Sequence, residues 1–175
     1  MSNYFINTDI YLRAIEPEDM DVLYKWENDT RLWQKGGSIT PFSRYVIRQY
    51  IANSVQDIYE IKQLRMMIIE KATDIAVGTI DLYEFDALNK RAGVGILIDE
   101  DYQRRGYALQ SLQCIERYAF GHLQLHQVFA HIGHNNLSSI SLFAKAGYEQ
   151  TARLKNWLVN NKACVDVVVM QRFNK

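Results

Sequence analysis

The sequence is poor in cysteine and proline, and neither sign of charge is in excess. Its two cysteines, Cys114 and Cys164, lie far apart and lack the C-x-x-C spacing of a metal or redox site. Because a domain of this size needs no disulfide, we read both as reduced thiols of a cytoplasmic protein. Lys and Arg together number 20, as do Asp and Glu. This balance gives no reason to expect a nucleic-acid partner or a membrane surface.

Long apolar segments are also missing. The longest unbroken aliphatic runs are Met66–Ile69 and Val167–Met170, far short of the roughly 18 residues that span a bilayer. The first residues, Met1 to Phe5, have neither the basic nor the apolar region of a secretory signal. We therefore expect no membrane span and no targeting segment, and a cytoplasmic location.

What is present is the composition of an ordinary folded protein. Hydrophobic residues make up 48% of the chain and charged residues 23%, which excludes disorder for the bulk of it. The 175 residues fit one domain, 1–175, and no stretch has the composition of a linker, a repeat or a low-complexity segment.

Hydrophobic periodicity predicts a mixed fold. Helices are expected from Pro17 to Glu27, over 43–54, from Tyr107 to Phe120 and over 138–146, and strands over 10–14, 64–70, 76–85, 92–98, 128–132, 149–154 and 166–173. The strands between 64 and 98 form an antiparallel meander, with a turn at 71–74. A helix between strands 92–98 and 128–132 implies one parallel crossover. The fold class is α/β (α+β), a mixed central sheet of about seven strands with four helices.

A basic turn opens the helix that follows strand 92–98. Main-chain N–H groups at a helix start are unsatisfied, and the helix dipole adds positive potential there. Gly106 lets the main chain approach a ligand closely, and Arg104 and Arg105 add charge. Together these features predict a pyrophosphate site. The alternative is an ordinary turn with two solvated arginines, because the motif is short.

A second motif, Asn136-x-x-Ser139-x-x-Leu142-Phe143-x-Lys145-x-Gly147-Tyr148, follows the next strand. With Gln103-x-x-Gly106-x-Ala108 it resembles the GNAT acetyltransferase superfamily, and the resemblance extends from Ile10 to Phe173. Within the superfamily, the chain is similar to the branch of spermidine N-acetyltransferases and ribosomal-protein N-terminal acetyltransferases. The opening segment 12–19 is shared by both types.

The resemblance implies the GNAT fold, acetyl-CoA as co-substrate and no metal. It implies transfer of an acetyl group to a primary amine, with a polyamine such as spermidine as one acceptor. An N-terminal acetyltransferase of the ribosomal-protein type and a non-catalytic acyl-CoA-binding module are the alternatives. The acceptor would be a small-molecule amine or a peptide N-terminus, and a homo-oligomer is left open. The implied co-substrate-binding residues are Ile96, Leu97, Ile98, Gln103, Arg104, Arg105, Gly106, Tyr107, Ala108, Asn136, Ser139 and Phe143.

The reaction needs proton transfer. An alkyl amine with a pKa near 10.4 is only about 0.04% neutral at pH 7, so a general base is useful. Glu84 is the first candidate, since it matches an acidic position of the spermidine type; the alternative is a solvated glutamate at a strand end. Phe143 stands where many GNAT enzymes carry a proton-donating Tyr, and Gly93 stands where some relatives carry a basic Glu. The candidate catalytic residues are Glu84, as the base, and Tyr148, as the group that protonates the leaving thiolate. Tyr107 and Tyr83 are alternatives to Tyr148 for this role.

Three other features have a functional and a structural interpretation. The four histidines fall between His122 and His134 without a zinc motif, so no metal is expected, although His131 or His134 could carry a proton. The first thirty residues hold seven acids and two bases, which either attract a cationic acceptor or form a solvated helix face. Trp26 and Trp33 either line the acceptor site or belong to the core.

Overall fold

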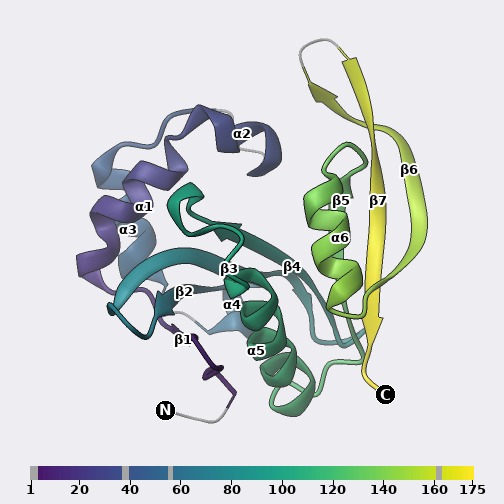
Figure 1. The fold of residues 1–175 in the computed structure, drawn as a ribbon, viewed down its shortest axis with the longest axis horizontal. Helices are drawn as coiled ribbons and strands as arrows, with labels where there is room; N and C mark the ends of the chain where they lie inside the picture. Colours follow the sequence, from purple (N-terminus) through teal and green to yellow (C-terminus); the bar gives the residue numbers. More distant parts are fainter. Residues whose placement is uncertain (1–3, 37–39, 55–56, 161–162) are drawn as a thin grey trace.

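The computed structural model describes the chain except for residues 1–3, 37–39, 55–56 and 161–162 (Figure 1). Its helices are α1 (Met20–Glu27), α2 (Thr30–Gly36), α3 (Arg44–Asn53), α4 (Ile58–Ile61), α5 (Tyr107–Gly121), α6 (Leu137–Lys145) and the 3-10 helices η1 (Pro17–Asp19) and η2 (Glu100–Tyr102). Its strands are β1 (Ile10–Arg13), β2 (Leu64–Glu70), β3 (Ile75–Asp86), β4 (Arg91–Ile98), β5 (Gln127–Gly133), β6 (Glu149–Asn160) and β7 (Ala163–Phe173). None of the helices in the described ranges has the length and apolar character needed to cross a bilayer.

The seven strands form one mixed sheet in the order β1-β2-β3-β4-β5-β7-β6. Strands β4 and β5 form the parallel pair, and the other neighbouring strands pair antiparallel. The sequence-based expectations of a meander over β2–β4 and of a parallel crossover through α5 are confirmed. The expected mixed α/β fold is confirmed as well.

Each face of the sheet is covered by helices, which gives two hydrophobic cores. On one face, α5 packs against β3, with Leu112 and Ile115 in the same cluster as Ile80 and Leu82. On the other face, residues of α1 and α3 surround Met67 and Ile69 of β2. The neighbouring Met66 and Ile68 belong to the first core. The apolar run 66–69 is therefore one strand buried on both faces, which explains why it lacks alternation.

Three parts of the fold differ from the sequence-based expectation. Helix α2 was not expected: the sequence predicts a loop over 36–41, with Gly36, Gly37 and Pro41, whereas Gly36 ends the helix. Residues 37–39 of this predicted loop lie outside the described residues. Helix α4 was missed because it has four residues, capped by Asp57 and ended by Lys62 at φ 58°. Strands β6 and β7 extend beyond 154 and before 166. These ends of the hairpin were missed because their residues are mostly exposed and show no apolar alternation.

Candidate active site

Strands β4 and β5 are hydrogen-bonded neighbours for only part of their length. Pairing joins residues 91–93 to 127–129. Beyond Gly93 the neighbour of β4 is β3 alone, and β5 continues along β7. In the described chain, the β5-facing edge of Ile96, Leu97 and Ile98 therefore has no strand partner. Main-chain N–H and C=O groups that lack a strand partner require another hydrogen-bond partner. An extended ligand can take the place of the missing strand and form these hydrogen bonds.

The turn after β4 leads into α5 with an uncapped N-terminus. Gln103 donates its side-chain amide to the Ile98 carbonyl oxygen at 3.1 Å and so fixes the turn onto the end of β4. Gly106 is the N-cap residue of α5, at φ 83°, and no side chain caps the helix there. Glycine adopts this left-handed conformation without the strain of a Cβ. The first N–H groups of α5, including those of Tyr107 and Ala108, are thus open to an anion.

The two arginines of the turn have different surroundings. Arg105 donates to the Asp101 carbonyl oxygen at 2.9 Å, lies 3.5 Å from the Glu70 carboxylate and stacks over the Tyr102 ring. Its charge is therefore used to hold the turn. Arg104 is exposed and makes no ion pair or hydrogen bond with any residue of the described chain. Arg104 is thus the arginine that is free to meet a phosphate.

The side chain of Tyr107 points away from the turn. It is buried and its hydroxyl donates to the Glu70 carboxylate of β2. This hydrogen bond raises the pKa of Tyr107 above its ordinary value. Tyr107 therefore links α5 to β2, and only its main-chain N–H faces the candidate anion site.

Helix α6 begins at the second motif. The Asn136 side-chain oxygen accepts from the Ser139 N–H at 3.2 Å and from the Ser138 hydroxyl at 2.9 Å. Asn136 is thus the N-cap of α6, and its amide nitrogen makes no hydrogen bond within the described chain. Phe143 is buried, with its ring 4.9 Å from that of Tyr148 in an edge-on contact. This motif follows β5, whereas the turn 103–106 follows β4. The two motifs therefore lie on opposite sides of the β4–β5 divergence.

Glu84 lies at an irregularity of β3. The register between β3 and β4 shifts between Tyr83 and Asp86, and Glu84 has φ 50°. Its exposed side chain lines a pocket of about 300 Å³ with Arg91, Phe129 and His131 among the other lining residues. The structure therefore brings Glu84 and His131 together beside the paired end of β4 and β5.

Tyr148 lies outside the Glu84 pocket and packs beside Glu116 of α5. Its hydroxyl is buried close to the Glu116 carboxyl, but the two do not form a well-aligned hydrogen bond. Burial raises the pKa of Tyr148, and it also raises the pKa of Glu116 to about 7, although Arg172 lies 3.4 Å away. The structure thus places Tyr148 with Glu116 and Arg172, apart from the pocket that holds Glu84.

The histidines do not converge on one point. His122 stacks on Tyr118, His126 contacts Phe173 and His131 contacts Phe129. Among the described residues, no group of three His, Cys, Asp or Glu side chains could hold a metal ion. Of the four, His131 is the histidine that lies in the Glu84 pocket.

Comparison with known proteins identifies the family. Residues 9–149 match the acetyltransferase (GNAT) domain, which is most of the chain. The chain belongs to the GNAT acetyltransferase family. It is 28% identical to the uncharacterized N-acetyltransferase p20 of Bacillus licheniformis, over 89% of this chain and 88% of that protein.

Two solved structures share the fold of this GNAT acetyltransferase. One is spermidine N-acetyltransferase from Vibrio cholerae in complex with CoA and spermine, with a TM-score of 0.86 at 20% identity over 95% of this chain and 96% of that one. The other is a putative ribosomal-protein-serine acetyltransferase from Vibrio cholerae, with a TM-score of 0.75 at 20% identity over 97% of both chains. These likenesses establish a common fold.

A half-buried ion-pair cluster on the α1–α3 face was missed by sequence reasoning. Arg65 of β2 pairs with Asp81 of β3 at 2.6 Å and with Glu27 of α1 at 2.5 Å, and its guanidinium lies over the Tyr50 ring. Burial raises the pKa of Asp81, and Arg65 opposes this effect. Arg65 and Asp81 are opposite each other in the strand register. The sequence signal that could have indicated this cluster is one basic and one acidic residue, Arg65 and Asp81, within two otherwise apolar strands.

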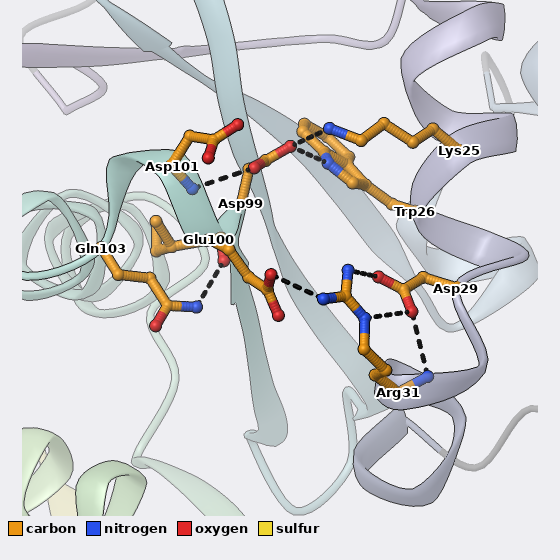
Figure 2. Close-up of polar contacts among 9 residues, drawn as sticks. Lys25, Trp26, Asp29, Arg31, Asp99, Glu100, Asp101 and Gln103 are labelled. Atoms are coloured by element: carbon orange, nitrogen blue, oxygen red, sulfur yellow. Dashed lines mark hydrogen bonds and ion pairs between the residues drawn. The ribbon is translucent and has the colours of Figure 1, made fainter.

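A second polar network joins the helices to the turn after β4 (Figure 2). Asp99 accepts from Lys25 at 2.8 Å and from the Trp26 indole at 2.7 Å, and Arg31 donates to Glu100 at 2.8 Å. Trp26 is 5% exposed, so it is a core residue whose polar atom holds the turn. Trp33 donates its indole N–H to the Glu27 carbonyl oxygen at 2.7 Å. The α1–α2 segment is thereby fixed to the turn that leads to α5.

The N-terminal acids of this acetyltransferase are largely ion-paired. Four of the seven acids among the first thirty residues pair with arginines, namely Asp19 with Arg13, Asp21 with Arg44, Glu27 with Arg65 and Asp29 with Arg31. The net negative charge of this segment is therefore partly neutralised by Arg31, Arg44 and Arg65 from outside it.

Proposed function

We propose that this chain transfers the acetyl group of acetyl-CoA to a primary amine, with a polyamine such as spermidine as the first candidate acceptor. The observation that carries the proposal is the divergence of β4 from β5 beside the uncapped N-terminus of α5. An extended pantetheine arm matches the open edge of a strand, and a pyrophosphate matches a helix N-terminus. The two sites are connected by the short turn 99–106.

The residues present suit acetyl-CoA as co-substrate. The open main-chain edge of Ile96, Leu97 and Ile98 would take the pantetheine amides. The N–H groups at Gly106, Tyr107 and Ala108 would take the pyrophosphate, with Arg104 as the free countercharge. Across the divergence, the Asn136 amide nitrogen and the Ser139 and Phe143 side chains of α6 would border the arm. When bound, acetyl-CoA supplies the thioester that the amine attacks.

We assign the role of general base to Glu84. Its carboxylate lines the pocket with His131 and is exposed, so it can accept a proton directly or through water. A main-chain N–H on the open edge of β4 would stabilise the oxyanion. Tyr148 was the first candidate for the proton donor, but its position beside Glu116 gives that role no support.

The charge on the α1–α3 face favours a cationic acceptor. There, the two carboxylates Asp81 and Glu27 surround one guanidinium, Arg65. Of these groups, Asp81 lies close to Gly95 of β4. An excess of negative charge raises the local concentration of a cation. A polyamine meets this condition and carries the primary amine that the reaction needs.

The alternative acceptor is a peptide N-terminus, which the shared fold with a ribosomal-protein-serine acetyltransferase favours. A panel of spermidine, spermine, a peptide with an N-terminal Ser or Ala and an aminoglycoside distinguishes the acceptors, with thiol release from acetyl-CoA as the readout. We expect the polyamines to give the highest kcat/KM. Faster turnover of the peptide would favour the alternative acceptor. If none of the amines causes thiol release, the chain would be a non-catalytic acyl-CoA-binding module.

Self-association is part of the proposal. Trp157 and Val159 on the β6–β7 hairpin are 62% and 76% exposed, and exposed apolar side chains of this size suit an interface. Sedimentation velocity of the wild type and of Trp157→Ser tests this. We expect the wild type to sediment as an oligomer that the substitution weakens; a monomeric wild type would contradict it.

A further inference from the structure

The ring of Tyr83 occupies the space above Gly93, at the point where β4 leaves β5. Gly93 and Phe129 form the last pair between the two strands, and Tyr83 pairs with Gly93 from β3. A Cβ at Gly93 would lie 2.3 Å from Cζ of Tyr83, which no real contact allows. The absence of a side chain at position 93 therefore lets the Tyr83 ring lie across β4.

Two groups of β5 lie next to this ring. Phe129 meets it edge-on, with the ring centroids 6.0 Å apart. Burial raises the pKa of the Tyr83 phenol, and the main-chain N–H of His131, two residues further along β5, lowers it. Burial is the larger of the two effects, so the pKa is raised overall. The phenol therefore stays protonated at neutral pH.

The Tyr83 hydroxyl thus has an unused donor. Its oxygen lies near the main-chain N–H of His131, and its own O–H donates to no acceptor in the described chain. The hydroxyl lies beside His131, just past the last β4–β5 pair, where the two strands begin to separate. This is the innermost point that a thioester lying between the strands could reach.

We propose that Tyr83 is the proton donor to the departing CoA sulfur. The assignment rests on the proposed function, acetyl transfer at the β4–β5 divergence. Other aromatic side chains near the site are not suited to the role. Phe143 has no proton to give, the Tyr107 hydroxyl is held by Glu70, and the Tyr148 hydroxyl is buried beside Glu116.

The step balances without any further reactant. The ammonium form of the amine first gives one proton to Glu84, directly or through water. The neutral nitrogen then forms the new N–C bond and loses a second proton to solvent. The C–S bond breaks, its electron pair goes to sulfur, and Tyr83 transfers its phenolic proton there. The Tyr83 phenolate regains a proton from solvent or from Glu84. The products are the acetylated amine and free CoA thiol.

The first test is Tyr83→Phe, measured by single-turnover transfer from acetyl-CoA so that product release does not mask the chemistry. We expect the transfer rate to fall by roughly 10²-fold, while the Kd for acetyl-CoA changes less than about threefold, because the ring is kept. An unchanged transfer rate in this variant overturns the assignment. A wild type that transfers acetyl to no amine overturns the proposed function instead.

The glycines of β4 provide a matched pair of variants. Gly93→Ala places a methyl group against the end of the Tyr83 ring and should displace the hydroxyl, so its transfer rate should fall as that of Tyr83→Phe does. At Gly95 a Cβ would meet Asp81 and Tyr83 at 3.7–3.9 Å, which is ordinary contact. Gly95→Ala should therefore keep at least about a third of the rate. Because Gly95→Ala leaves the Tyr83 ring in place, equal losses in both alanine variants would show that the loss does not depend on the Tyr83 hydroxyl and would contradict the assignment.

A second readout needs no acceptor. A hydroxyl that donates to the sulfur stabilises the thiolate of bound CoA, because a hydrogen bond to a charged group is stronger than one to a neutral group. Ultraviolet titration of bound CoA should therefore show a thiol pKa about one pH unit higher in Tyr83→Phe than in the wild type. The same thiol pKa in both proteins would contradict contact between Tyr83 and the sulfur, whatever the acceptor is.

Discussion

Glu116 offers a test of the packing of α5 that does not depend on activity. The residue is 4% exposed, one of its carboxyl oxygens has no hydrogen-bond partner, and burial raises its pKa from 4.5 to about 7. Arg172, 3.4 Å away, lowers the pKa but does not offset burial. The folded protein therefore holds a proton that the unfolded chain releases between these two pH values.

The sign and size of the effect follow from linkage. Below pH 4.5 both states are protonated and the group has no effect. As the pH rises toward 7, the unfolded state loses its proton and the folded state keeps it, so the stability of the fold falls. Above pH 7 the full penalty applies, and the difference between 4.5 and about 7 corresponds to roughly 3 kcal/mol as an upper bound. Glu116→Gln keeps the shape and removes the ionisation.

We therefore expect Glu116→Gln to be more stable than the wild type at pH 8, by about 1–3 kcal/mol. Urea unfolding at several pH values measures the difference, which should shrink toward pH 5. Comparison with the wild type at each pH cancels the contributions of other carboxyls. Glu149→Gln, at an exposed glutamate, is the matched control and should have little effect. A Glu116→Gln variant that is less stable than the wild type at pH 8, or a difference independent of pH, would refute the reasoning.

Three further predictions concern the site. Gly106→Val should weaken acetyl-CoA binding at least about tenfold, because φ 83° disfavours a branched residue; calorimetry measures it, and normal affinity in a folded variant would exclude this turn as the pyrophosphate site. Glu84→Gln should lower kcat/KM by roughly 10²-fold, with a smaller loss at high pH where more amine is neutral; wild-type activity across pH 6–9 would exclude the base. Asp99→Asn should destabilise the fold by about 1–3 kcal/mol through weaker contacts to Lys25 and Trp26; an unchanged urea midpoint would show that this network contributes little.

The helices and strands were predictable where the hydrophobic spacing of the local sequence matches the face that is packed in the fold. Helix α5 has apolar residues at helical spacing and a glycine before its first turn, so the sequence indicated both its face and its start. The four-residue helix α4 has too few positions to display a period, and its boundaries depend on one cap and one left-handed residue. The ends of the β6–β7 hairpin are set by pairing between the two strands. Because the residues there are exposed, they show no hydrophobic period from which the strand ends could be predicted.

The candidate site was predictable at its motifs and not at its contacts. The uncapped turn before α5 and the Asn136 N-cap are local, so their residues could be named from the sequence. The position of Tyr83 across Gly93 depends on the register of β3 and β4, which an irregularity shifts just beyond Tyr83. Likewise, nothing local in the sequence indicates that the Tyr107 hydroxyl is held by Glu70 of a distant strand.

Titration of the protein with acetyl-CoA tests the central claim most directly, that the β4–β5 divergence and the α5 N-terminus bind this co-substrate. A ligand that binds only the folded state at 100 times its Kd stabilises that state by about 2.7 kcal/mol. We predict saturable heat of binding in calorimetry and a raised melting temperature, and we predict that Gly106→Val binds at least about tenfold more weakly and shows a smaller rise in melting temperature while remaining folded. No heat of binding and no change in melting temperature at millimolar acetyl-CoA would contradict the account.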